Sequence, residues 1–172
     1  FMKSKFARES YTVSTHEVLP NDTNTLNTLF GGKLMQWMDL TAGIAAQRHS
    51  GRVVVTAAVN NISFDYAVKL SDIVTLEAKV SRVFNTSMEV FVDVYVENPQ
   101  TGEKKKCNEA IIIFVAVDQN GRPIEIPPMI PETDLEKKRY DSALRRRQLS
   151  LILAGKMKPD DATELKALFK KD

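Results

Sequence analysis

The sequence has almost no cysteine and no long apolar run. Its 172 residues include one cysteine, Cys107, which excludes an intrachain disulfide framework and fits a reducing compartment. No apolar stretch reaches the roughly 18 residues that a membrane-spanning helix needs, and the first residues lack the apolar core of a secretory signal. We therefore expect a cytoplasmic protein with no membrane partner.

A strong excess of charge of either sign is also missing. Lys and Arg number 24 and Asp and Glu 22, which gives a formal net charge of +2. A nucleic-acid-binding protein usually carries a much larger basic excess, so no nucleic-acid partner is expected. The length and the 43% hydrophobic content fit one globular domain with a core of its own.

Several catalytic signatures are absent as well. The sequence has no G-x-S-x-G elbow, no phosphate-binding G-x-x-x-x-G-K-[ST] loop, and neither paired cysteines nor an H-E-x-x-H motif. His16 and His49 lie far apart, each beside polar residues, and we expect both to be ordinary surface groups. No metal site is predicted.

Residues 32–48 predict one helix, because Leu34, Trp37, Met38, Thr41 and Ile44 recur at helical spacing. Most of the intervening residues are apolar too, and a helix that is apolar nearly all round belongs inside a protein. Gly51 suits the left-handed position that ends such a helix.

After this helix the pattern becomes that of strands, predicted over residues 53–68, 73–83, 88–97 and 107–117. Residues 88–97 alternate strictly and have one mostly polar face. The turn segments 98–102 and 120–121 are too short to connect parallel strands, so the sheet should be antiparallel. One buried helix with such a sheet around it gives the fold class α+β. The proline-rich residues 121–131 should leave the sheet, and residues 132–153 and 159–170 predict two polar helices.

Asp39 is unusual because it follows Trp37-Met38 on the apolar helix. Burial of a carboxylate without partners is costly, so a functional interpretation is a base or nucleophile placed in a cleft. The structural alternative is a partly exposed Asp39 at the one wet position of the helix, bonded to Lys33 or Gln36.

Gly31 and Gly32 begin the same helix. Glycine lets a backbone come close to a ligand, and the free N–H groups of a helix start suit a polarised carbonyl or an oxyanion. A plain flexible loop is the alternative interpretation, since two glycines alone are a weak signal.

Together these residues resemble the signature of the hotdog-fold acyl-CoA thioesterases of the brain acyl-CoA hydrolase and YciA-like group. The matching stretch is Asn24-Thr25-Leu26-x-x-Leu29-Phe30-Gly31-Gly32-x-Leu34-x-x-Trp37-Met38-Asp39. The likeness continues through Val54-Val55-Thr56 and Ser63-Phe64 and covers roughly residues 11–120. It implies a hotdog domain over residues 1–131, a long central helix wrapped by a curved antiparallel sheet, followed by a C-terminal helical extension over residues 132–172.

The resemblance also implies an activity, hydrolysis of acyl-CoA thioesters to fatty acid and coenzyme A. Asp39 would be the general base or nucleophile, and Asn24 of the opposite subunit would bind the thioester carbonyl or the attacking water. The backbone N–H of Gly31 or Gly32 would stabilise the oxyanion. A homo-oligomer, either a dimer or a trimer of dimers, is implied, with no cofactor beyond the coenzyme A of the substrate.

For the coenzyme A arm we select polar residues at strand ends or in the turn before Met88: Asn60, Arg82, Thr86 and Ser87. Asp22-Thr23 precedes Asn24 where many relatives have a histidine, a departure that bears on acyl-chain preference. The alternatives to a thioesterase are a hotdog hydratase or dehydratase, which usually relies on a histidine near the central helix, and a non-catalytic acyl-CoA or nucleotide sensor.

Overall fold

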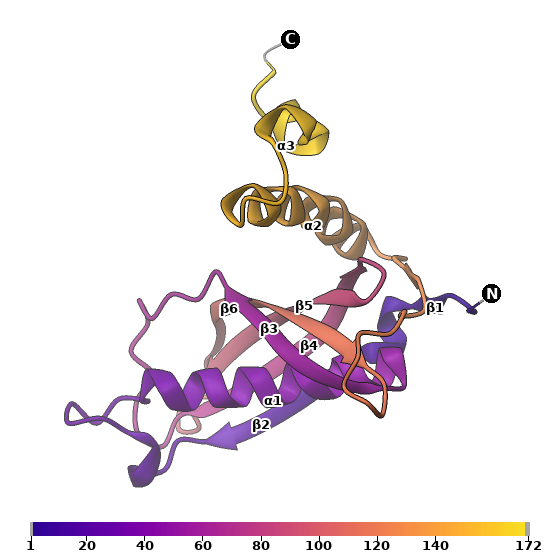
Figure 1. Cartoon of the computed structure of the whole chain (residues 1–172). Helices are drawn as coiled ribbons and strands as arrows, with labels where there is room; N and C mark the ends of the chain where they lie inside the picture. Colours follow the sequence, from indigo (N-terminus) through magenta and orange to yellow (C-terminus); the bar gives the residue numbers. More distant parts are fainter. Residues whose placement is uncertain (1, 171–172) are drawn as a thin grey trace. The chain divides into compact units, whose positions relative to one another are not determined.

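Figure 1 shows the computed structural model of the chain, which describes residues 2–170. The chain divides into two compact units, Phe1–Ile130 and Pro131–Asp172, and each is described by itself. The predicted assignment of residues 1–131 and 132–172 to a domain and an extension stays a prediction.

The central helix of the first unit is α1, Gly31–Ser50. It ends as predicted at Gly51, which has a φ of 64° and donates its N–H to the carbonyl of Gln47 at 2.8 Å. One face is buried, with Leu34, Trp37, Met38, Ala42 and Ala45 among its residues. The prediction that the helix is enclosed all round is wrong for a single chain, because Met35, Leu40 and Ile44 are exposed.

A five-stranded antiparallel sheet curves around α1 (Figure 1). Its order is β2-β4-β5-β6-β3, with bounds Thr12–Glu17, Ile73–Val83, Ser87–Glu97, Lys104–Val117 and Val53–Asn60. Sequence patterns did not predict β2, whereas β4 has the predicted bounds. The strand β3 lies at one edge and pairs on one side only, with β6, among residues 2–170.

The strand β3 is shorter than predicted. It stops at Asn60 because Asn61 adopts a left-handed backbone conformation, with a φ of 56°. Residues 61–68 form a loop instead, and the carbonyl of Val68 accepts the N–H of Leu29 at 2.7 Å. This hydrogen bond ties the loop to the segment that leads into α1.

The polar face of β5 is not a solvated one. Glu89 is 1% exposed and Asp93 9%. Ser81 donates its hydroxyl to Oε1 of Glu89 at 2.6 Å, and Lys106 pairs with Asp93 at 2.8 Å. The carboxylates are therefore buried with partners, as the cost of burying a lone charge requires.

Short elements complete the first unit. They are β1 (Lys5–Phe6), which pairs in parallel with β7 (Met129–Ile130), and the 3-10 turns η1 (Ala7–Ser10) and η2 (Pro20–Asp22). The segment between β6 and β7 is irregular, as its prolines predict.

Both histidines differ from the prediction of ordinary surface groups. His49 is fully buried, and its Nε2 lies 2.7 Å from the carbonyl oxygen of Pro127. His16 is half-buried, and its ring stacks on Trp37 with 4.3 Å between ring centroids.

The second unit holds α2 (Asp134–Leu153), η3 (Pro159–Asp161) and α3 (Thr163–Ala167). Thr133 and Glu136 cap the start of α2 reciprocally. The predicted helix over residues 159–170 is wrong, because Ala162 has a ψ of 70° and interrupts it. Between residues 2 and 170 no helix is both long and apolar enough to cross a membrane.

Candidate active site

Asn24 organises the loop that leads into α1. Its Oδ1 accepts the backbone N–H groups of Leu26 at 2.9 Å and Thr28 at 3.2 Å, and its Nδ2 donates to Oγ1 of Thr28 at 2.9 Å. A side-chain amide carries two N–H donors, so one N–H of the exposed Asn24 has no partner among residues 2–170. That donor can bind a carbonyl oxygen.

The first turn of α1 leaves two backbone donors free. No side chain caps the helix, and within residues 2–170 the amides of Gly31 and Gly32 have no hydrogen-bond partner. A Cβ at Gly31 would lie 3.2 Å from the ring of Phe64, and one at Gly32 would lie 2.6 Å from the ring of Phe30. Both rings belong to exposed phenylalanines, so a side chain at either glycine would displace the ring beside it. The free N–H groups of the two glycines suit an oxyanion.

Asp39 lies half-buried on α1, and Thr56 on β3 donates its hydroxyl to Oδ1 of Asp39 at 2.7 Å. The alternative partners Lys33 and Gln36 are wrong: Lys33 pairs with Asp22 at 3.7 Å. Oδ2 of Asp39 has no partner in the part of the chain that the structure describes. A carboxylate that is held through one oxygen and free at the other can accept a proton or attack a carbonyl with the free oxygen.

Sequence reasoning did not select Thr56 as a site residue. In the folded structure Thr56 lies beside a β-bulge, since the pairing of β3 with β6 shifts between Thr56 and Ala58, and no pattern in the sequence indicates it. Bulges re-aim side chains and are frequent beside active sites.

A single chain does not bring these groups to one point. Asp39 follows Gly31 by eight residues, which places it about 12 Å farther along the helix axis. One thioester carbon cannot lie within bonding reach of Asp39 and of the Gly31 and Gly32 amides of the same chain.

The residues selected for coenzyme A are scattered. Asn60 is the last residue of β3, Arg82 lies in β4, Thr86 in the following turn, and Ser87 begins β5. Figure 1 shows the β4–β5 turn at the opposite end of the sheet from the loop before α1.

The side chain of Ser87 also points away from α1. It is in register with Val115 and, through it, with Val55, the neighbour of Thr56. Because alternate residues of a strand face opposite sides and Thr56 faces α1, this row of side chains faces the other side of the sheet.

Among residues 2–170 no group of three or more His, Cys, Asp or Glu residues is arranged to hold a metal ion. The candidate site consists of one carboxylate, one hydroxyl, one amide side chain and two backbone N–H groups. These are the components of acyl transfer from an activated carbonyl to water.

Known proteins that are similar to this chain in sequence and fold are thioesterases. The sequence profile of the thioesterase superfamily matches residues 26–103. The uncharacterized acyl-CoA thioester hydrolase YkhA of Bacillus subtilis (strain 168) is 42% identical over 144 residues, which are 84% of each chain.

Two solved structures are similar along most of the chain. An apo-hexameric acyl-CoA thioesterase superposes with a TM-score of 0.86 and 37% identity, covering 89% of this chain and 98% of its own. The Staphylococcus aureus acyl-CoA hydrolase, solved with butyryl coenzyme A, coenzyme A and coenzyme A disulfide, gives 0.80 and 32%, covering 97% and 99%. This chain belongs to the thioesterase superfamily and has its hotdog fold.

Proposed function

We propose that this protein hydrolyses acyl-CoA thioesters to a carboxylic acid and coenzyme A. The observation that carries the proposal is Asp39, half-buried on the central helix and held by Thr56 with its second carboxylate oxygen free. The similarity to acyl-CoA hydrolases over most of the chain supports the substrate class.

Asp39 acts in one of two ways. As a general base it takes a proton from water, whose oxygen bonds to the thioester carbon while the carbon–sulfur bond breaks, and the proton then passes from Asp39 to the sulfur, so that coenzyme A leaves as its thiol. As a nucleophile its carboxylate oxygen bonds to the thioester carbon while the carbon–sulfur bond breaks, so that an Asp39–acyl anhydride forms and coenzyme A leaves as its thiolate. Water then cleaves the anhydride to the carboxylic acid and the Asp39 carboxylate, and the proton that water releases goes to the thiolate. In both cases negative charge develops on the carbonyl oxygen, where the Nδ2 of Asn24 and the amides of Gly31 and Gly32 donate hydrogen bonds.

The complete site is shared between two subunits. The rise of about 12 Å between Gly31 and Asp39 along α1 keeps the oxyanion donors and the carboxylate of one chain apart. A second copy of the chain supplies the oxyanion donors that Asp39 lacks in its own chain. It pairs through β3, a sheet edge with one unpaired side, and through exposed apolar residues of β3 and α1. Those residues are Leu40, Ile44, Val53, Val55 and Val59.

Asn60, Arg82, Thr86 and Ser87 remain our proposed contacts for the coenzyme A arm. Arg82, Thr86 and Ser87 lie at or beside the β4–β5 turn. Figure 1 shows this turn at the end of the sheet away from the loop before α1, so Arg82 and Thr86 serve a carbonyl held by the partner's loop rather than by their own. The side chain of Ser87 faces away from α1.

The alternative of a hydratase or dehydratase requires a histidine base near the central helix. His49 is on α1, but it is fully buried and its Nε2 is bonded to the Pro127 carbonyl. His49 therefore cannot reach a substrate and does not support this alternative. The other histidine, His16, stacks on Trp37 of α1, and thiol release separates a hydrolase from a hydratase directly.

The test is release of free thiol from acetyl-, butyryl-, hexanoyl- and palmitoyl-CoA, followed with a thiol reagent. We expect hydrolysis of at least one of them that is lost in Asp39→Asn. Binding of acyl-CoA without any thiol release would establish the non-catalytic sensor instead.

A further inference from the structure

A cavity of about 260 Å³ lies next to the proposed carbonyl site, within the first unit. Asn24 and Gly31 line it on one side. Its other walls include Phe64 and two deeply buried apolar residues, Leu34 and Val68, which are 5% and 4% exposed. The catalytic mechanism assigns nothing to this space.

The remaining wall is formed by an irregularity in β6. In the pairing with β5, Val94 lies opposite Asn108 and Tyr95 opposite Lys106, so Cys107 is an extra, bulged residue. In a regular strand neighbouring side chains face opposite sides of the sheet. Here Cys107 and Asn108 both line the cavity, which the bulge makes possible.

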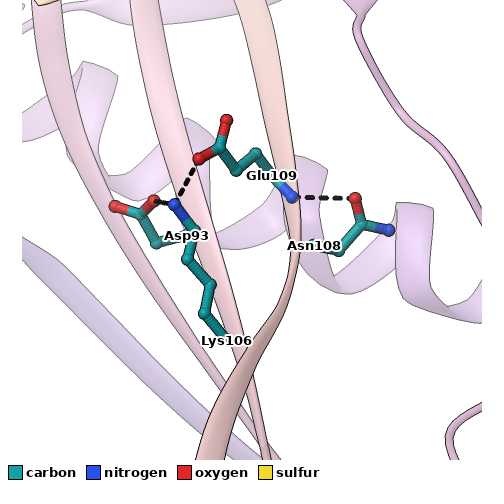
Figure 2. Close-up of polar contacts among 4 residues, drawn as sticks. All are labelled: Asp93, Lys106, Asn108 and Glu109. Carbon is teal, nitrogen blue, oxygen red and sulfur yellow. Dashed lines mark hydrogen bonds and ion pairs between the residues drawn. The ribbon is translucent and has the colours of Figure 1, made fainter. Parts of the chain in front are cut away.

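Polar contacts fix this bulge on both sides, as Figure 2 shows. Asp93 and Glu109 lie directly opposite each other in register and would repel, but Lys106 pairs with both, at 2.8 Å in the case of Asp93. Burial lowers the pKa of Lys106, but its bonds to Asp93 and Glu109 outweigh burial and raise the pKa above its ordinary value. Lys106 therefore keeps its positive charge.

Asn108 connects the bulge to the opposite wall of the cavity. Its Oδ1 accepts the N–H of Glu109 at 2.7 Å, and its Nδ2 donates to the carbonyl of Ser63 in the loop of residues 61–68. That loop carries Phe64 and Val68, so the two walls of the cavity are held relative to each other.

We propose that this cavity binds the acyl group of the thioester and that Cys107 limits the acyl length; the inference rests on the proposed function. A carbonyl held by Asn24 and Gly31 has the acyl chain on one side and the sulfur on the other, and the cavity begins at these two residues. Leu34, Phe64 and Val68 offer apolar surface to an alkyl chain. The polar side chains of the lining are already hydrogen-bonded within the chain, apart from the Asn24 donor assigned to the carbonyl, whereas the amides of a pantetheine arm need free partners when buried. Those polar residues are Asn24, Thr28, Tyr66 and Asn108. The volume of the cavity is below the about 300–1,000 Å³ typical of pockets for drug-sized ligands, so the acyl group is a short one.

The single cysteine gives a direct probe of occupancy. Burial raises the pKa of the Cys107 thiol, so alkylation by iodoacetamide is slow and can be followed by mass spectrometry of the whole protein. S-butyl-CoA, a thioether that cannot be hydrolysed, should slow alkylation by at least about tenfold at a saturating concentration, because its alkyl group fills the cavity. Free coenzyme A at saturation should give little protection.

Equal protection by coenzyme A and S-butyl-CoA would mean that the pantetheine arm occupies the cavity, and protection by neither would mean that no part of the ligand does. Either result overturns the proposal. Saturation is established beforehand by calorimetry, so an absence of binding is not mistaken for an empty cavity.

Substitutions test the limit on length. Cys107→Leu should reduce the ratio of kcat/KM for hexanoyl-CoA to that for acetyl-CoA by about tenfold or more, because each excluded methylene is worth about 10–200-fold in a fitted pocket. Ala67→Leu fills the cavity from the exposed loop and should shift the ratio the same way even if the cysteine variant folds poorly. Val117→Leu, on the same strand but outside the cavity, is the matched control.

The failures are distinguishable. A wild-type protein that hydrolyses no acyl-CoA contradicts the proposed function itself. Hydrolysis with an unchanged ratio in both cavity variants leaves the thioesterase in place and refutes the acyl cavity alone.

Discussion

Thr56 donates its hydroxyl to Oδ1 of Asp39 at 2.7 Å, across the 17 residues that separate them in the chain. The bond links β3, the edge strand of the sheet, to α1, and it leaves one carboxylate oxygen of Asp39 free. A hydrogen bond to a carboxylate both orients it and stabilises its charged form. This relationship makes Thr56 a positioning residue for the reaction.

Thr56→Ala should therefore lower kcat by about 10- to 100-fold, since a hydrogen bond to a charged group contributes about 1.5–3 kcal/mol. Thr56→Ser keeps the hydroxyl and should restore most of the rate. The measurement is steady-state thiol release from the best acyl-CoA substrate for both variants. Equal rates in the alanine and serine variants would show that the hydroxyl has no part in catalysis.

Asp39→Asn should reduce turnover by at least about a hundredfold, the scale expected when a general base is removed. Asparagine has the same shape and can still accept the hydrogen bond of Thr56, so the fold and the binding of coenzyme A should persist. Calorimetry with coenzyme A measures the binding, and thiol release measures the rate. Turnover near the wild-type value in a folded variant would exclude Asp39 as base and as nucleophile alike.

Local chemistry explains which parts of this structure could be predicted from the sequence. Helical spacing and Gly51 gave α1, and the β-branched run of residues 73–83 gave β4. The strand β2 escaped prediction because Thr12–Glu17 contains one aliphatic residue, Val13, and the end of β3 depends on the left-handed conformation of Asn61. The role of Thr56 depends on β3 packing beside α1, a long-range contact that no local pattern encodes.

The buried His49 should make the stability depend on pH. Its Nε2 carries the proton that it donates to the Pro127 carbonyl, and its buried Nδ1 has no hydrogen-bond partner. Burial lowers the pKa of His49, although the bond to Pro127 and the nearby Glu9 oppose this and Lys5 adds to it. A second proton would place a charge at the unpartnered Nδ1.

Below about pH 6.5, the pKa of histidine in the unfolded chain, the unfolded chain takes up a proton that the folded chain does not. The free energy of unfolding should therefore decrease as the pH is lowered, by up to about 1.4 kcal/mol per pH unit. Melting temperatures measured between about pH 7.5 and 5 should fall less steeply in His49→Gln than in the wild type. His16→Gln, at the half-buried histidine, is the matched control and should change the slope less. Identical slopes in the wild type and His49→Gln would contradict the assignment.

The last prediction concerns the shared site. If Asn24 and Asp39 act on one thioester from opposite chains, Asn24→Ala and Asp39→Ala should each be inactive alone. When the two proteins are mixed and exchange subunits, half of the dimers pair unlike chains, and each of these has one intact site and one with both defects. Activity should return to at most roughly a quarter of the wild-type value per site. Residues acting from the same chain would leave one defect in every site, and nothing would be recovered.

Sedimentation at micromolar protein must first show a dimer or a larger species, and native mass spectrometry must show mixed oligomers, because slow exchange also gives no activity. Mixed oligomers without regained thiol release would refute the arrangement across subunits while leaving the hydrolase activity itself untouched.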